Sequence, residues 1–353
     1  MRYLITVSSL TPGSGLTRYV FNLCGILKEG NELFVLTTHD EGSNEYALAE
    51  LTKISPDIKL IALGKASKIG KYLKTMAWIR KISPDKIINN YNGVVQFVLP
   101  FIGSKVKVIH ILHNDTDDFY RIGAINGKRI AGWIAPTQAI ADHFNSYTGG
   151  KYVSRVEVIP HGVATAEHNE RRSGTLEIVF AGVLYEHKGV KVLPGIIKKL
   201  LGKGIDLRFT IIGGGILADW LRESFRGEIE NGTVTMTGVI DHERVYTLMS
   251  KADVFLYPTH LDAFGLVIAE AMMNGAVPVV TLLLGITDNL VDHGNNGFLL
   301  PQDDIDAFAE AIEEIYNDSE KRTALSRKAF EKAEKSLSMP VMKANYLSYL
   351  SNL

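Results

Sequence analysis

The chain has 353 residues, of which 46% are hydrophobic, and this is enough to build packed cores in two domains of ordinary size. Its net charge of −1 and its charged fraction of 22% exclude a mostly disordered chain and a protein whose overall charge attracts nucleic acid. The single cysteine, Cys24, cannot form an internal disulfide and is typical of a reducing compartment.

No segment has the character of a membrane span. The longest uncharged runs, 87–104 and 271–287, are interrupted by asparagine and proline, whereas a spanning helix needs about 20 mostly apolar residues. The N-terminus is an apolar strand that runs into a glycine turn, without the long apolar stretch of a signal peptide. We therefore expect a cytoplasmic protein.

Short apolar runs alternate with helical stretches along the chain, which predicts α/β architecture with doubly wound parallel sheets. In the first half the expected strands are 3–7, 33–37, 58–62, 86–89, 106–112 and 132–135. After a polar stretch at 164–175 they are 176–181, 207–212, 233–238, 253–257, 277–281 and 297–300.

The interruption at 164–175 predicts two Rossmann-like domains. We place an N-terminal domain at 1–163 and a C-terminal domain at 164–335. A C-terminal helix, 336–353, is expected to return to the first domain. The tail from 304 onward is helical, with Asp304 as its N-cap.

Charge is distributed unequally between the two halves. Residues 1–165 hold 19 basic and 13 acidic side chains, whereas 166–353 hold 19 and 26. The densest basic run, 65–81, contains no acid and predicts an amphipathic helix. Its apolar residues at helical spacing are Ile69, Leu73, Met76 and Ile79. The basic flank is either a solvated helix face or a surface that docks weakly on an anionic membrane.

Three glycine-rich turns each follow an expected strand and directly precede a helix. They lie at 13–15, at 213–215 and at Gly265. Each could direct backbone N–H groups at a phosphate, as helix N-termini in such sheets do. Each could equally be a tight turn that needs only a positive φ angle. The glycines alone leave both interpretations open.

Two carboxylates lie eight residues apart across the junction of a loop and a helix. Asp262 is in the loop after the strand that ends near Tyr257, and Glu270 is in the helix that opens near Gly265. Carboxylates repel phosphate but accept hydrogen bonds from the hydroxyls of sugars and ribose. This junction therefore favours a site for the hydroxyls of a sugar or a ribose.

Several further segments complete a recognisable set. Asp262 and Glu270 align with a Glu-x(7)-Glu signature, and the other matching segments are 14–18, 160–163, 182–184, 188–189, 211–215, 285–288 and 296–299. With these segments the chain resembles the retaining GT-B glycosyltransferases of glycosyltransferase family four, the group 1 glycosyltransferases. The resemblance covers nearly the whole chain and is strongest over 159–303. It implies two Rossmann-like domains that face each other across a cleft. In this picture 1–163 is the acceptor-side domain and 164–335 is the nucleotide-sugar-binding domain.

The resemblance implies a reaction in which a sugar moves, with retention, from a UDP- or GDP-linked donor to an acceptor hydroxyl, without a cofactor. Lys188 would bind the donor diphosphate, and Glu270 would bind the ribose. Asp262 would hold the transferred sugar. The backbone N–H groups assigned to the same sugar are those of Phe264, Gly265 and Leu266.

The resemblance also assigns donor-binding residues in the glycine turns and in the first domain. Gly213 and Gly215 would border the donor, and Gly15 and Arg18 would approach its diphosphate. His113, after the strand at 106–112, matches a family histidine that touches the donor sugar. Catalysis is thus assigned to Asp262, His113 and Lys188.

The chain departs from the family pattern at the cation that binds phosphate. Val183 replaces an arginine and removes a bidentate donor, so that Lys188, Arg18 and helix N-termini would neutralise the diphosphate alone. Asp115-Thr116-Asp117 spells a D-x-D sequence in a first-domain loop, where we expect a polar loop and no metal.

The family picture implies a glycan or lipid-linked acceptor in cell-envelope polysaccharide or glycoconjugate synthesis, at the inner face of a membrane, and no nucleic acid. Two alternatives stay open. One is a non-catalytic glycosyltransferase-like partner subunit, which the loss of arginine at Val183 motivates. The other is a nucleotide-sugar epimerase, or a phosphorylase, on the same fold.

Overall fold

The computed structural model describes residues 1–39, 44–166 and 174–353, which form two compact units. The N-terminal unit comprises Met1–Gly162 and Met339–Leu353, and the C-terminal unit comprises Val163–Ser338. The division after Gly162 lies one residue before the predicted boundary. The predicted start of the last helix, at 336, falls inside helix α14 (Ser319–Leu337), and the chain enters the N-terminal unit again at Met339. Of the predicted polar stretch, 167–173 lie outside the described residues.

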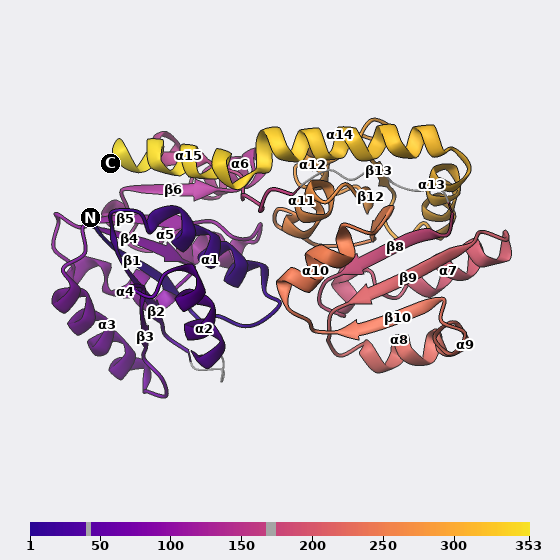
Figure 1. Ribbon diagram of the computed structural model, residues 1–353. Helices are drawn as coiled ribbons and strands as arrows, with labels where there is room; N and C mark the ends of the chain where they lie inside the picture. Colours follow the sequence, from indigo (N-terminus) through magenta and orange to yellow (C-terminus); the bar gives the residue numbers. More distant parts are fainter. Residues whose placement is uncertain (40–43, 167–173) are drawn as a thin grey trace. The chain divides into compact units, whose positions relative to one another are not determined.

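A parallel sheet forms the centre of the N-terminal unit (Figure 1). Within the described residues its seven strands have the order β3-β2-β1-β4-β5-β6-β7. They are β1 (Arg2–Val7), β2 (Glu32–Thr37), β3 (Lys59–Ala62), β4 (Lys86–Asn90), β5 (Lys107–Ile111), β6 (Gly132–Ala135) and β7 (Val156–Val158). The sequence predicted all but β7, which is short and only half-buried, so that it lacks the apolar run of the others.

The helices of the N-terminal unit pack in two groups. Helix α1 contacts α2 and α15, whereas α3, α4, α5 and α6 contact one another in succession. Their bounds are α1 (Gly15–Leu27), α2 (Asn44–Ile54), α3 (Lys68–Ile82), α4 (Gly93–Val98), α5 (Asp117–Ala124), α6 (Gln138–Tyr147) and α15 (Met339–Ser351), with short 3₁₀ turns η1 (Leu99–Phe101), η2 (Gly127–Arg129) and η3 (Val153–Arg155). Met342 and Tyr346 of α15 are buried in the same core as Tyr19 of α1.

The C-terminal unit is built on a second parallel sheet, whose six strands within the described residues have the order β10-β9-β8-β11-β12-β13. They are β8 (Leu176–Ala181), β9 (Leu207–Ile212), β10 (Val234–Gly238), β11 (Val254–Tyr257), β12 (Val277–Thr281) and β13 (Phe298–Leu300). The helical segments are η4 (Glu186–Lys188), α7 (Leu193–Gly202), α8 (Ala218–Ser224), α9 (Arg226–Glu230), α10 (His242–Met249), α11 (Leu266–Met273), α12 (Thr287–Leu290), α13 (Ile305–Asn317) and α14. As predicted, Asp304 caps α13, and its side chain accepts a hydrogen bond from the Ala307 N–H at 3.0 Å.

Each sheet has one topological switch point, between β1 and β4 in the N-terminal unit and between β8 and β11 in the C-terminal unit. In doubly wound sheets, ligands bind outside the carboxyl ends of the strands at such points. Gly15 follows β1, while Lys188 and Asp262 follow β8 and β11. The order of the strands therefore brings most of the predicted site residues to these two edges.

Helix α3 confirms the predicted helix over the basic run but corrects its apolar face. Ile79 and Ile82 are buried, whereas the side chains of Ile69 and Leu73 are 71% and 58% exposed. Only the last two turns of α3 cover the core, so the apolar residues at its start face solvent. Among the described residues, no helix is both long and apolar enough to cross a membrane.

Candidate functional site

Asp262 is the centre of the hydrogen-bond network at the switch point of the C-terminal unit. Its Oδ2 accepts from Lys188 Nζ and from the Tyr257 hydroxyl, both at 2.9 Å. Its Oδ1 accepts from the N–H groups of Ala263, Phe264 and Gly265 at 2.8, 3.2 and 2.9 Å. Both carboxylate oxygens are thus fully engaged inside the protein.

The environment of Asp262 keeps its carboxyl ionised. Burial by itself would raise the pKa, but the Lys188 ammonium and the hydrogen bonds from Lys188, Gly265 and Tyr257 outweigh it, and the pKa is lowered. Burial and the neighbouring Asp262 carboxylate raise the pKa of the Tyr257 hydroxyl well above its usual value. Tyr257 therefore stays protonated and donates.

This network changes the role expected for the loop N–H groups. The sequence assigned the N–H groups of Phe264, Gly265 and Leu266 to the transferred sugar, yet the first two donate to Asp262. An aspartate, one methylene shorter than the family's glutamate, reaches back to its own loop in this way. Leu266 is the first residue of α11, where N–H groups lack a partner within the helix.

Lys188 is held against the same loop from the turn after β8. Its Nζ donates to the Leu261 carbonyl at 2.9 Å, and it lies 5.4 Å from the centroid of the Tyr257 ring. The next residue, Gly189, has a φ angle of +65°, and a Cβ there would lie 1.7 Å from the Pro258 carbonyl oxygen. Only glycine therefore allows the two loops to approach closely enough for the ion pair.

Glu270 lies on α11 and is 6% exposed. Its Oε1 accepts from His242 Nε2 at 2.9 Å and from the Tyr246 hydroxyl at 3.4 Å. His242 and Tyr246 lie on α10, and their rings meet edge to face with centroids 4.3 Å apart. Sequence reasoning missed both residues. Because Glu270 stands inside the apolar helix sequence LVIAEAMM, its carboxylate needs a hydrogen-bond partner. The sequence does not show which residue provides it.

Close backbone contacts explain why glycine occupies the turn after β9. A Cβ on Gly213 would lie 1.9 Å from the Gly182 carbonyl oxygen, and one on Gly215 would lie 2.6 Å from that of Leu184. Both have positive φ angles. Close contact between the turns after β8 and β9 therefore accounts for these glycines without a donor. Val183, in the first of these turns, is 38% exposed.

The N-terminal unit holds the other predicted residues at its own switch point. Gly15 is exposed at the start of α1 with open space around its Cα, and the enclosed Nε of Arg18 has no hydrogen-bond partner among the described residues. His113 Nε2 lies 2.9 Å from Asn90 Oδ1. Burial, with smaller effects of His161 and His110, lowers the His113 pKa well below its usual value, so the ring is neutral.

The D-x-D sequence is not arranged as a metal site. Asp115 accepts from Tyr120 at 2.5 Å and pairs with His143 Nδ1 at 2.9 Å, while Asp117 is exposed in the first turn of α5. No group of three or more side chains suited to holding a metal occurs among the described residues. Metal independence of the reaction stays a prediction.

Most of the C-terminal unit matches a known protein family. Residues 165–332 match the family described as "Glycosyl transferases group 1". Glycogen synthase of Mycobacterium tuberculosis is 28% identical over 173 residues, which are 48% of this chain and 42% of that protein. D-inositol 3-phosphate glycosyltransferase of Pseudarthrobacter chlorophenolicus is 30% identical over 218 residues, 58% of this chain and 51% of that protein. The chain thus spans about half the length of these relatives.

A longer alignment joins the chain to phosphatidyl-myo-inositol mannosyltransferase of Mycolicibacterium smegmatis, with 26% identity over 92% of this chain and 86% of that protein. Among solved structures, Anabaena Alr3699/HepE in complex with UDP superposes with a TM-score of 0.81 at 17% identity, covering all of both chains. S. aureus TarM gives a TM-score of 0.80 at 12% identity, over 99% of this chain and 98% of that one. Residues 165–332 therefore match the group 1 glycosyltransferases, and the chain has the GT-B fold, as predicted.

Proposed function

We propose that this protein is a retaining, metal-independent glycosyltransferase that moves a sugar from a UDP- or GDP-linked donor to an acceptor hydroxyl in glycoconjugate synthesis. One observation carries the proposal. A largely buried cation, Lys188, and two carboxylates, Asp262 and Glu270, gather at the carboxyl ends of β8 and β11, inside the region that matches the family. Two of the relatives named above are a glycosyltransferase and a mannosyltransferase by name, and HepE is described in complex with UDP-glucose.

In the proposed reaction, the bond between the anomeric carbon and the diphosphate oxygen breaks as the acceptor oxygen attacks the same face of the sugar. The acceptor proton passes to the leaving diphosphate. Lys188 stabilises the negative charge that grows on the diphosphate. Glu270 accepts hydrogen bonds from the ribose, and His113 contacts the donor sugar as a neutral ring. No residue serves as a nucleophile, so positioning and electrostatics supply the rate enhancement.

The test begins with thermal unfolding in the presence of UDP, GDP, ADP and their sugars, because a ligand that binds only the folded state raises the Tm. Transfer to a panel of methyl glycosides is then measured in EDTA with the nucleotide sugar that binds. We expect one nucleotide class to bind and the product to keep the anomeric configuration of the donor. Transfer that is lost in EDTA and recovered with Mn²⁺ or Mg²⁺ would refute metal independence.

The same experiment separates the alternatives. An epimerase would return isomerised donor without transfer, and a phosphorylase would consume inorganic phosphate. A non-catalytic partner subunit would bind no nucleotide and would co-purify with an active transferase. Any of these results replaces the proposed function.

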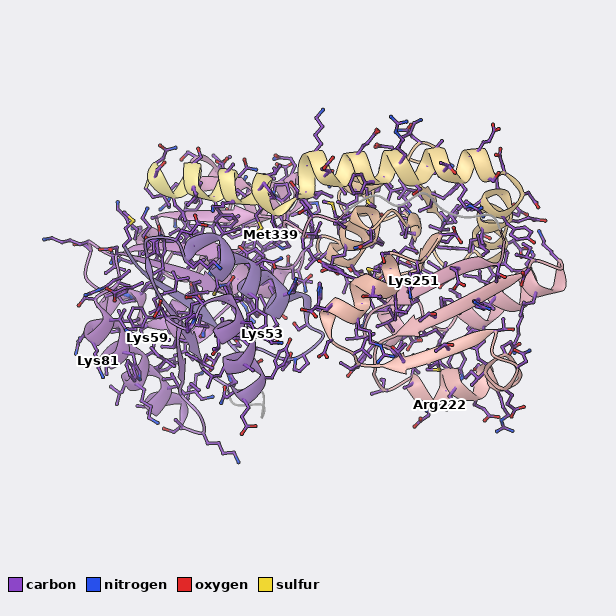
Figure 2. All side chains as sticks on the ribbon, in the orientation of Figure 1. Lys53, Lys59, Lys81, Arg222, Lys251 and Met339 are labelled. Carbon is purple, nitrogen blue, oxygen red and sulfur yellow. The ribbon has the colours of Figure 1, made fainter. Side chains whose placement is uncertain are left out.

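We further propose that the N-terminal unit docks weakly on the anionic inner face of a membrane. The exposed Ile69 and Leu73 lie among Lys68, Lys71 and Lys74 of α3, and Phe97 and Phe101 of the contacting α4–η1 segment are 49% and 69% exposed. Lys81, labelled in Figure 2, covers the Trp78 ring at 4.6 Å near the end of the same helix. Each basic residue near an anionic surface contributes about 1 kcal/mol.

Co-sedimentation with anionic vesicles at low salt tests this docking. Changing Lys68, Lys71 and Lys74 to glutamate should abolish it, whereas a charge-matched control should retain much of it. The control changes three exposed lysines outside α3 to glutamate: Lys128, Lys151 and Lys335. Equal co-sedimentation of the α3 variant and the parent would refute the membrane contact.

A further inference from the structure

Tyr91 has an unusual backbone conformation at the switch point of the N-terminal unit. It directly follows β4, and its φ angle is 53°. This left-handed region is disfavoured for bulky side chains because the Cβ approaches the following carbonyl oxygen. Such an outlier persists only where its surroundings enforce it, and it justifies a search for a function.

Buried amides enforce this turn. Asn92 Nδ2 donates to the Val7 carbonyl at 2.9 Å, and Asn92 Oδ1 accepts from the Val94 N–H at 3.1 Å. Asn89 Oδ1 accepts from the Thr6 hydroxyl and from the Asn92 N–H at 2.9 and 3.1 Å. These amides fix the backbone on both sides of Tyr91 whatever its side chain. Glycine or asparagine would fit the turn with less strain, so the turn does not itself require an aromatic ring.

The Tyr91 ring lies flat against Phe119, with centroids 3.7 Å apart and planes at 12°. Phe119 belongs to α5, which follows β5, the neighbour of β4 in the sheet. Both rings are half-buried, so part of each remains accessible. The exposed carboxylates of Asp117 and Asp118 lie on the same turn of α5 as Phe119.

On the basis of the function proposed above, we propose that Tyr91 and Phe119 form a platform for a saturated sugar or cyclitol ring of the acceptor. The C–H face of such a ring packs on an aromatic surface, and its hydroxyls donate to carboxylates such as Asp117 and Asp118. The neighbouring Asn90 holds His113 at 2.9 Å. Tyr91 thus directly follows the residue that contacts His113, the group assigned to the donor sugar.

Saturation-transfer NMR tests the platform without nucleotide, using methyl α-D-glucopyranoside, methyl α-D-mannopyranoside and myo-inositol as probes. Irradiating aromatic protons should transfer saturation to at least one probe. Tyr91→Leu should weaken the binding of that probe about two- to tenfold, while Tyr91→Phe should retain it. Tyr147→Leu is the matched control, because Tyr147 is another partly exposed tyrosine of this unit, at 41%, and it should leave binding unchanged.

Thermal unfolding separates a binding role from a packing role. If Tyr91 serves only packing, Tyr91→Asn should lower the Tm and leave saturation transfer intact, and this result overturns the proposal. If it serves binding, Tyr91→Asn should relieve backbone strain, hold or raise the Tm and abolish saturation transfer. The platform is also refuted if nucleotides bind the parent but none of the probes does, whereas absence of nucleotide binding would count against the proposed function itself.

Discussion

The ammonium of Lys188 lies 2.9 Å from Asp262 Oδ2, so this pair joins the turn after β8 to the loop after β11. The two side chains are 14% and 17% exposed. A lysine ammonium has three donors, and two of them bind Asp262 and the Leu261 carbonyl. One donor is therefore left, and under the proposed function it would bind a diphosphate oxygen without breaking the pair.

Lys188→Ala should lower both nucleotide affinity and the transfer rate. The substitution removes the positive charge that would neutralise the diphosphate. It also leaves Asp262 ionised without its cation, which should lower the free energy of unfolding by about 1–3 kcal/mol. Calorimetric titration with the nucleotide that binds, together with urea unfolding, measures the two effects. Val183→Arg is the complementary variant and should tighten nucleotide binding. Affinity and rate within a few-fold of the parent in Lys188→Ala would place diphosphate binding elsewhere.

Gly189→Ala should disrupt the site far more than Gly204→Ala. Both glycines have left-handed backbones, with φ angles of +65° and +77°, so alanine strains both by about 1 kcal/mol. Around Gly204 the space is open, whereas a Cβ on Gly189 would lie 1.7 Å from the Pro258 carbonyl oxygen. Gly189→Ala should therefore separate the two loops, abolish nucleotide binding and lower the Tm. Similar Tm values and affinities in the two variants would contradict the close approach.

Much of the fold could be predicted because parallel strands that are buried on both faces appear as apolar runs. Segments such as LEIVFA and VPVVT coincide with β8 and β12. Strand β7 has no such run and was missed. Burial of helix faces was harder, because an apolar spacing such as that of Ile69 and Leu73 does not show which side of the helix meets the sheet.

The family motifs predicted which residues form the site, but not the contacts that these residues make. The family pattern assigned Lys188, Asp262 and Glu270 to one site, and the structure pairs the first two at 2.9 Å. That Asp262 holds the transferred sugar stays a prediction. That its carboxylate caps its own loop depends on side-chain length and a local turn, which alignment does not register. His242 contacts Glu270 from another helix, and such a long-range pair leaves no spacing in the sequence.

His242→Ala should weaken nucleotide binding through Glu270. His242 Nε2 lies 2.9 Å from Glu270 Oε1, and its loss should let the carboxylate rotate away from the ribose. The affinities of parent and variant are measured for the nucleotide and for its 2′,3′-dideoxy analogue, which lacks the ribose hydroxyls. The four values form a double-mutant cycle. We expect a loss of about 1 kcal/mol for the ribonucleotide and little for the analogue. His242→Gln should restore part of the difference, and equal losses for both ligands would show that His242 does not act through Glu270.

The buried His110 should make the N-terminal unit sensitive to acid. It lies on β5, is 1% exposed, and burial lowers its pKa to about 3. In the unfolded chain a histidine takes up a proton below about pH 6.5, whereas in the folded unit it stays neutral until about pH 3. The unfolded state therefore binds more protons in this window, and stability falls as the pH drops through it.

Within this window, each unit by which the pH falls lowers the free energy of unfolding by about 1.4 kcal/mol. His110→Phe removes the titrating group and keeps a ring of similar size, while the Asn89 amide that faces His110 Nδ1 retains Gln96 Oε1 at 2.9 Å. Urea unfolding between about pH 7 and pH 5 should show a shallower loss of unfolding free energy in the variant than in the parent. More than about one unit above pH 6.5 His110 is neutral in both states, so the difference between variant and parent should be constant there. Curves that run parallel down to about pH 5 would show that His110 takes up its proton equally in the folded and unfolded chain.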